Sequence, residues 1–305
     1  MRKLFGVVIL MSFVSIGSVF AAPLLVSGDM TITEGNAIEE INAYGQANIT
    51  ITGGEVSKII LAQDANLDMQ GGTVSTLKTF DNSTANITGG TTNYLETYCS
   101  SEVIVDNGLE SSTVPTISSA KFESGICKIN GGTVGEVTLG ASVEVFVSGG
   151  TVNGIKRWDP IVGNPAVVIL GGTLGSIDMY TGRVTCKGGQ IDSLGISSIA
   201  KAEIHAGGIN GLTGIPKLIE GYTFVVDDAS KLPFGGDDNQ PHIWGTYKNG
   251  QQFDISLPDI IYDSVQFTTK AVCTNQPDAD LTGDCVVNTS DLAVFASEWL
   301  DSGLK

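Results

Sequence analysis

The sequence predicts an all-β protein built on a parallel β-helix, a solenoid in which short strands stack coil upon coil. A glycine pair, usually followed by Thr-Val, recurs along the chain, and apolar residues stand at fixed distances from it. The first glycines of the pairs are Gly53, Gly71, Gly89, Gly131, Gly149, Gly171, Gly188 and Gly207. They follow one another at 17 to 22 residues, apart from one interval of 42, which Asn107-Gly108 divides as a degenerate copy. One coil cannot bury its apolar side alone, so such a repeat indicates stacked coils around a shared interior.

Four apolar columns predict the strands on each side of the glycine corner. Positions two and four before the first glycine alternate with polar residues, as a half-buried strand requires. Positions three and six after it are also apolar, for example Val74 and Leu77. In the last copy the alignment places Glu203 and His205 in the two columns that precede the glycine. We expect all four columns to point inward, with the glycines forming a tight bend.

The repeat resembles the glycine-threonine-valine coils of many secreted bacterial β-helix proteins, over roughly residues 30 to 215. That resemblance implies architecture and no particular chemistry. Irregular intervals favour a right-handed winding, although coils of about 18 residues also fit a left-handed one. We assign residues 22–220 to the β-helix.

The first 21 residues read as a signal peptide. Arg2 and Lys3 precede an apolar stretch, and cleavage is expected after Ala21. An uncleaved membrane anchor is the alternative, since the stretch approaches spanning length. We expect a secreted or cell-surface protein with no membrane span after cleavage of the signal.

The glycine pattern stops near residue 221, and we assign residues 221–271 to a C-terminal β cap. The segment from His242 to Ile255 predicts a β-hairpin that turns at Asn249-Gly250. Because exposed strand edges at a solenoid end invite association, a covering element is the simplest reading of this segment.

Charge limits the expected partners. The 305-residue chain has a formal net charge of -17, which becomes -19 when the two basic residues of the signal peptide are removed. Such a surface repels phosphate backbones, so nucleic acid is not an expected partner. An excess of carboxylates suits a calcium-containing extracellular medium or serves solubility alone.

Residues 272–305 carry the most specific pattern in the chain. The 12-residue segment from Asp280 to Asp291 has oxygen-bearing side chains at alternating positions, which a hard cation such as calcium prefers. The expected ligands are Asp280, Thr282, Asp284, the carbonyl of Val286, Asn288 and Asp291. A helix with one apolar face follows, because Leu292, Phe295 and Trp299 recur at helical spacing. An acidic turn before a terminal helix is the alternative reading.

This loop and helix, at about residues 278–300, resemble one half of a type I dockerin, a module that docks extracellular enzymes onto cohesin-bearing scaffolds. The resemblance implies calcium as the cofactor and a cohesin-like or cell-surface protein as the partner. The chain departs from the family pattern at Cys285, where the turn usually has glycine. It also departs by having one such repeat where dockerins have two.

The five cysteines of an exported chain leave one unpaired. We expect a disulfide between Cys273 and Cys285, which flank the start of the terminal module. Cys127 and Cys186 fall in apolar columns and read as buried thiols. A bond between Cys99 and Cys127 of a neighbouring coil is a weaker alternative.

Two further columns are candidate binding surfaces. Nine residues after the first glycine stand the four residues that we call the aromatic column: Phe80, Tyr98, Trp158 and Tyr180. Pointing inward they fill the coil corner, which we expect, and pointing outward they form a carbohydrate-stacking surface. The residues directly after the glycine pairs form a threonine column: Thr73, Thr91, Thr133, Thr151 and Thr173. We attribute this column to the preference of threonine for β-strands rather than to a surface that orders water against ice.

No carboxylate cluster recurs at one coil position, so the residues favour a noncatalytic role. The pairs that come nearest to a catalytic arrangement are Asp178 with Arg183, and Asp159 with Arg157 and Lys156, and surface pairing explains each. We therefore expect a secreted, noncatalytic structural, adhesion or scaffold-associated protein. The alternatives are an extracellular polysaccharide lyase or glycoside hydrolase, or a carbohydrate-binding protein, docked through the terminal module.

Overall fold

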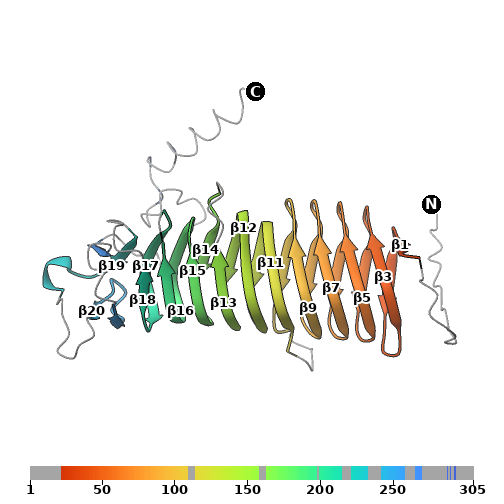
Figure 1. The fold of residues 1–305 in the computed structure, drawn as a ribbon, viewed down its shortest axis with the longest axis horizontal. Coiled ribbons are helices and arrows are strands. Elements are labelled where there is room, and N and C mark those ends of the chain that lie inside the picture. The colour runs from red at the N-terminus through yellow and green to blue at the C-terminus, as the bar shows by residue number, and fades with distance from the viewer. Residues whose placement is uncertain are drawn as a thin grey trace.

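The computed structural model describes residues 22–108, 114–157, 163–197, 199–214, 221–232, 242–257 and 265–269, with Val287, Thr289 and Leu292 as single residues. These residues form an all-β parallel β-solenoid of about ten turns. Its strands lie side by side in one long row, with the first coils at one end and β19 and β20 at the other (Figure 1). The fold class predicted from the glycine repeat is therefore confirmed.

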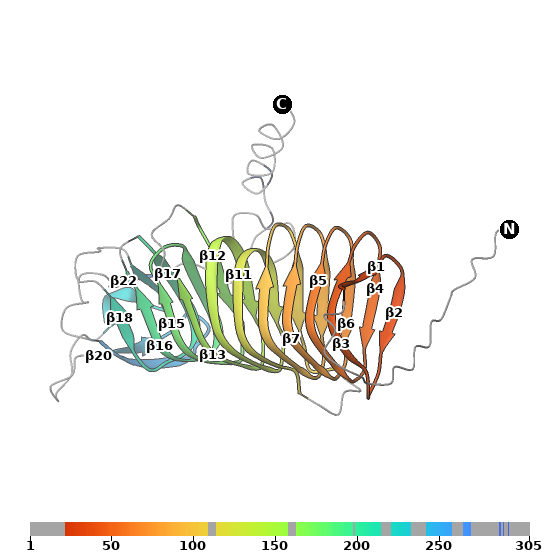
Figure 2. The same cartoon turned by 45° about the vertical axis from the view of Figure 1, so that its right-hand side comes forward.

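Each coil contributes one strand to each of two parallel ladders, which wrap around the interior as the turned view shows (Figure 2). The first ladder contains β2 (Asp29–Ile32), β4 (Asn48–Ile51), β6 (Asn66–Met69), β8 (Thr84–Ile87), β10 (Glu102–Val105), β14 (Ala166–Ile169), β17 (Lys201–Ile209), β19 (Tyr222–Val225) and β22 (Val265–Thr268). The second contains β1 (Leu24–Val26), β3 (Ala37–Ala43), β5 (Glu55–Leu61), β7 (Thr73–Thr79), β9 (Thr91–Thr97), β13 (Thr151–Arg157), β15 (Thr173–Met179) and β18 (Leu212–Gly214). Three long strands take part in both ladders: β11 (Thr116–Ile129), β12 (Thr133–Val147) and β16 (Arg183–Ile196). The end of β17 also joins the second ladder, where Gly208 and Ile209 pair with Gln190 and Ile191.

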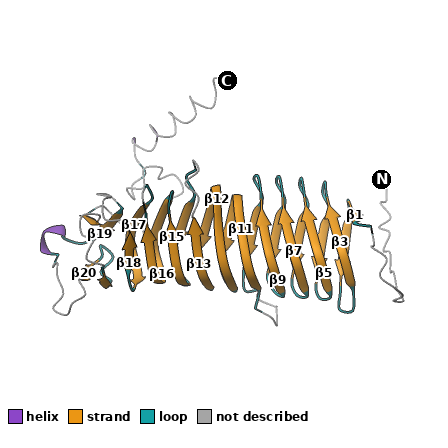
Figure 3. Cartoon of the chain, in the orientation of Figure 1, coloured by secondary structure: helices purple, strands orange, loops and turns teal. Residues whose placement is uncertain are grey.

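Loops separate the ladders at both edges of the row (Figure 3). The only helix among the elements assigned in the described ranges is a short 3-10 turn, η1 (Ala229–Lys231). Within those ranges, no helix has the length and apolar character needed to cross a membrane.

The core is one continuous apolar column along the solenoid. The predicted inward positions are buried in successive coils, as Met69, Val74 and Leu77 illustrate in one of them. Cα registers pair equivalent residues of adjacent coils, for instance Leu77 with Leu95. Burial of this column supplies the main driving force for stacking, because each coil covers the apolar side of its neighbour.

The last repeat differs from its predicted alignment. Glu203 lies on the outside, and the strand buries Ala202 and Ile204 instead, since Ile204 pairs with Cys186. A bulge then places His205 between two paired residues, because Lys187 pairs with Ala206. The assignment of Glu203 to an interior column was therefore wrong, and the glycine count could not reveal it because a bulge adds one residue to the strand.

The degenerate copy forms a regular coil with an insertion after Gly108. Asn107 takes the place of the first glycine, and its Oδ1 accepts a hydrogen bond from the Gly132 N–H at 2.8 Å. The strand resumes at Thr116, which pairs with Thr91 on one side and Thr133 on the other. Thr116 therefore belongs to the threonine column, although it lies far from the glycine pair in sequence.

The C-terminal segment contains the predicted hairpin and two further rungs of the solenoid. Strands β20 (His242–Thr246) and β21 (Gln252–Ser256) pair antiparallel, and Gly250 in their turn has a φ of 87°. β19 and β22 extend the first ladder beyond residue 220. The aromatic rings of the hairpin pack on β19, with Phe253 at 5.5 Å and Tyr247 at 6.5 Å from the Phe224 ring centroid.

Candidate functional site

The predicted calcium ligands (Asp280, Thr282, Asp284, Val286, Asn288 and Asp291) lie outside the described residues, as do Cys273, Cys285, Trp158 and the signal peptide. Thr289 and Leu292, within and just after the predicted loop, have helical backbone. Within the described part of the chain, no group of three or more His, Cys, Asp and Glu side chains is placed to hold a metal ion. The calcium site therefore stays a prediction.

The aromatic column faces outward where the structure describes it. Thr79 and Thr97 end their strands with buried side chains, so the residues that follow them, Phe80 and Tyr98, emerge on the opposite side. Both rings are half-buried and stack face to face, with centroids 4.7 Å apart and planes 2° from parallel. The expectation that these rings fill the coil corner was wrong. The alternation of inward and outward side chains continues through Thr79 and Thr97, so the next residue in each coil points outward. Tyr180 is likewise half-buried and follows the buried Met179.

Tyr44 and Ala62 occupy the position of the aromatic column in the two coils that precede Phe80. The backbone N–H groups of Tyr44, Ala62, Phe80 and Tyr98 each donate to a carbonyl of the preceding coil, at the same position in every coil. Tyr44 is 43% exposed. The sequence does place Tyr44 nine residues after a glycine, Gly35, which is the spacing of the aromatic column. The alignment did not include it because Gly35 has no second glycine beside it.

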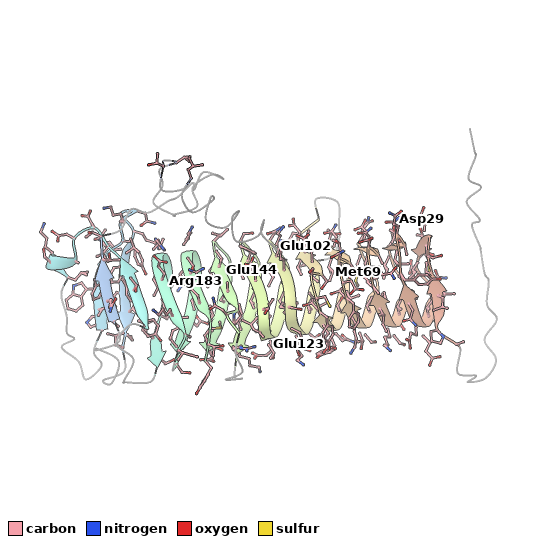
Figure 4. The ribbon with its side chains drawn as sticks, turned by 90° about the horizontal axis from the view of Figure 1, so that it is seen from above. Asp29, Met69, Glu102, Glu123, Glu144 and Arg183 are labelled. Atoms are coloured by element: carbon pink, nitrogen blue, oxygen red, sulfur yellow. The ribbon has the colours of Figure 1, made fainter. Side chains whose placement is uncertain are left out.

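A cluster of charged side chains lies beside the Phe80–Tyr98 stack. The Lys78 Nζ atom is 2.6 Å from Glu96 Oε2, and the Lys121 Nζ atom is 4.0 Å from Glu96 Oε1. Lys121 also pairs with Glu123, and Figure 4 shows Glu123 on the opposite long side of the solenoid from Glu102. Glu96 faces outward, yet its side chain is only 8% exposed, because its neighbours cover it.

The electrostatics of this cluster favour an ionised Glu96. Burial raises the pKa of Glu96, but hydrogen bonds from Lys78 and Tyr98 and the charges of Lys78 and Lys121 outweigh it, so the pKa is lowered overall. The hydrogen bond to Glu96, with burial and nearby negative charge, raises the pKa of Tyr98 to about 12. Glu96 is therefore a fixed carboxylate that orients Tyr98, and it is not poised as a proton donor near neutral pH.

We predict that Lys78→Met raises the pKa of Glu96 and weakens the protein at mildly acidic pH. A carboxyl whose folded pKa is lowered stabilises the fold above its unfolded pKa, and this contribution is lost as pH falls through the folded pKa. The variant should lose about 1 kcal/mol or less at neutral pH, since Lys78 is partly exposed. Its stability should also begin to fall at a higher pH than that of the wild type. Urea unfolding at a series of pH values from 3 to 7 measures both effects.

The matched control is Lys58→Met, which removes a lysine paired with Glu40 at 3.2 Å on the same ladder, where the glutamate is more exposed. It should change the acid limb of the stability curve less than Lys78→Met. Superimposable acid limbs for Lys78→Met and the wild type would contradict the role assigned to the pair.

Asp178 and Arg183, one of the pairs considered for catalysis, belong to different ladders. Asp178 lies opposite Lys156 on the second ladder, whereas Arg183 begins β16 on the first ladder. Burial, followed by the charge of Glu136, raises the pKa of Asp178. Arg157 points into the coil, where its Nη1 donates to the Leu139 carbonyl at 2.9 Å. Asp159 lies outside the described residues.

The threonine column is longer than the sequence indicated. Six adjacent rungs place a threonine at the same register position: Thr73, Thr91, Thr116, Thr133, Thr151 and Thr173. Glu55 pairs with its first member and Gln190 with its last. All six lie in strands, as expected of a β-branched residue on a half-buried surface.

Three cysteines are free thiols. Cys127 and Cys186 are buried in the core, and burial raises the pKa of both, that of Cys186 to about 12. Cys99 is exposed in a turn. The alternative of a Cys99–Cys127 disulfide was wrong, because one thiol points into the core while the other lies on the surface.

These observations define the class of protein as a parallel β-solenoid whose second ladder carries an outward aromatic column and ion pairs between coils. The chain matches no protein-family model, and comparisons with curated proteins and with solved structures find no match either.

Proposed function

We propose that this protein is a secreted, noncatalytic structural or adhesion protein that associates with an extracellular or cell-surface scaffold through a calcium-binding, dockerin-like C-terminal module. The observation that carries the noncatalytic part is the pairing of outward carboxylates with lysines of neighbouring coils. Besides Lys78 and Glu96, Lys156 lies 2.9 Å from Glu136, and Lys128 lies 2.7 Å from Glu102. Ion pairs of this kind stabilise a repetitive surface, and the pKa of Glu96 is lowered, whereas the acid of glycoside hydrolysis needs a raised pKa.

The proposal includes several features of the ends and the winding. Residues 1–21 act as a cleaved signal peptide, the solenoid winds to the right, and the β20–β21 hairpin closes the C-terminal end of the core. Aromatic packing between the hairpin and Phe224 supports the closing role. A cohesin-like or cell-surface protein is the partner, and a disulfide between Cys273 and Cys285 stabilises the module.

Calcium binding tests the docking part of the proposal. Isothermal titration of residues 22–305 with calcium should reveal one site, and Asp280→Ala should weaken it at least tenfold, because each carboxylate is a principal ligand of a hard cation. Asp301→Ala, beyond the predicted helix, is the matched control and should bind as the wild type does. Circular dichroism should show helix gained on calcium addition. Absence of binding, or equal binding by Asp280→Ala, would overturn this part.

Carbohydrate binding is a second candidate function, favoured by the outward stack of Phe80 on Tyr98. Flat aromatic faces suit the apolar faces of sugar rings. Incubation with a panel of polysaccharides, scored for both retention and cleavage, separates a binder from a polysaccharide lyase or glycoside hydrolase. Release of unsaturated or reducing ends would establish an enzyme and refute the noncatalytic assignment.

A further inference from the structure

The strongest candidate for a ligand site lies over Ala62, between the side chains of Tyr44 and Phe80. We call this place the Ala62 slot. The three residues occupy one position in three adjacent coils, since each N–H donates to the carbonyl at the same place in the coil before it. The register therefore places a small alanine side chain between two aromatic residues of the neighbouring coils.

The coil spacing sets the width of the slot. Adjacent strands lie about 4.8 Å apart, so equivalent atoms two coils apart are separated by about 9.6 Å. The ring centroids of Phe80 and Tyr98, one coil apart, lie 4.7 Å apart, which equals the coil spacing, and we infer the same alignment for Tyr44. Two aromatic faces about 9.6 Å apart leave room for one ring between them, with each face about 4.8 Å from its centre.

That width selects a puckered ring over a flat one. A planar aromatic ligand in contact on both sides would need only about 7 Å, twice a van der Waals contact. A saturated six-membered ring is thicker, because its axial hydrogens project from both faces, and it fills the slot. Its C–H groups then lie against the negative faces of the two aromatic rings.

The two walls differ in a way that suits binding. Tyr98 covers the far face of Phe80 and holds it in a parallel stack, so this wall is already ordered. Tyr44 is 43% exposed and forms the outer wall. A site with one fixed ring and one exposed ring admits a ligand from solvent and loses little side-chain entropy on binding.

Polar groups for sugar hydroxyls lie on the same outward side. Lys58 and Glu40 form an ion pair at 3.2 Å on the coils of Ala62 and Tyr44. The Oδ1 atom of Asn42, two residues before Tyr44, is buried and has no hydrogen-bond partner within the described part of the chain. Rotation of this amide would turn an unsatisfied group towards a ligand hydroxyl, and satisfying it is favourable.

Net charge decides between acidic and neutral sugars. A chain with a formal charge of -17 repels polyanions such as uronic acid polymers. We propose that the Ala62 slot binds an uncharged pyranose residue of a neutral polysaccharide, sandwiched between Tyr44 and Phe80. This inference rests on the carbohydrate-binding candidate above and is independent of the calcium module.

Affinity gel electrophoresis of residues 22–305 tests the slot, with hydroxyethylcellulose, xylan and galactomannan as neutral probes and polygalacturonate as the acidic probe. The wild type should be retarded by at least one neutral polysaccharide and not by polygalacturonate. Phe80→Ala should lose binding at least tenfold by removing a wall. Ala62→Trp should lose it to the same extent by filling the slot while leaving both walls in place.

Tyr94→Ala is the matched control, since Tyr94 is a half-buried tyrosine on the same ladder outside the slot, and it should bind as the wild type does. Thermal unfolding of each variant shows that loss of binding is not loss of fold. Neutral polysaccharide binding that survives both Phe80→Ala and Ala62→Trp would overturn the slot while leaving the carbohydrate-binding candidate intact. Absence of retardation by every neutral probe would overturn both.

Discussion

Replacing Gly90 with alanine is expected to destabilise the solenoid by at least about 2 kcal/mol. Gly90 is the second glycine of its pair, and its φ of +77° is one that residues with a Cβ adopt only with strain. An added Cβ would lie 2.5 Å from the carbonyl oxygen of Gly72 and 2.7 Å from the carbonyl carbon of Gly71. That Gly72 oxygen accepts the Thr91 N–H at 2.9 Å, so moving it away would disturb a bond between coils.

Gly35→Ala separates backbone strain from crowding. Gly35 has a φ of +84°, but a Cβ there meets nothing within 4 Å. It should therefore cost only about 1 kcal/mol, the penalty of the left-handed conformation. Urea unfolding followed by far-ultraviolet circular dichroism measures both variants, and equal losses at the two positions would show that contact between stacked corners contributes nothing.

The core could be predicted from the sequence because the same inward positions recur in every coil. In a stacked coil each inward position repeats, so Ile59, Leu77 and Leu95 form a column that the glycine spacing reveals directly. The glycine corner itself is equally visible, because the backbones of adjacent coils approach too closely there for a side chain. Both signals come from steric constraints that act in every coil.

A fifth inward column was missed because its members are not all apolar. It follows the column of Leu77 by two residues and contains Leu61, Thr79, Thr97, Phe122, Leu139, Arg157, Met179 and Ile196. Its polar members are satisfied inside the protein, for example by a 2.9 Å hydrogen bond from Thr79 to Ser101 and another from Thr97 to the Ser124 carbonyl. Hydropathy cannot identify a buried position whose polar group finds its partner in the next coil.

Missing this column also led to the wrong orientation of the aromatic residues. Because Thr79 belonged to none of the four predicted columns, the sequence did not indicate that Phe80, the residue after it, lies on the outside. The same reasoning hid the Ala62 slot, since alanine carries no signal of its own and Tyr44 belongs to a coil without a glycine pair. Only the register between coils brings these two residues together with Phe80.

Two buried tyrosines near the C-terminal end should respond oppositely to loss of the hydroxyl group. The Tyr222 hydroxyl accepts a hydrogen bond from the Ile196 N–H at 3.0 Å and donates towards the carbonyls of Leu194, at 3.0 Å, and Thr213. Tyr222→Phe leaves a buried N–H without its partner, so we expect a loss of about 2 to 3 kcal/mol. The Tyr247 hydroxyl is buried with no hydrogen-bond partner among the described residues.

Tyr247→Phe is consequently the matched control, and it should be neutral or stabilise the protein by up to about 1 kcal/mol, since it removes a desolvated polar group. Both side chains are almost fully buried, so the ring contribution to packing is the same before and after each change. Burial raises the pKa of both phenols, which keeps them protonated throughout a urea titration at pH 7. If Tyr247→Phe lost as much stability as Tyr222→Phe, hydrogen bonding could not be what distinguishes the two sites.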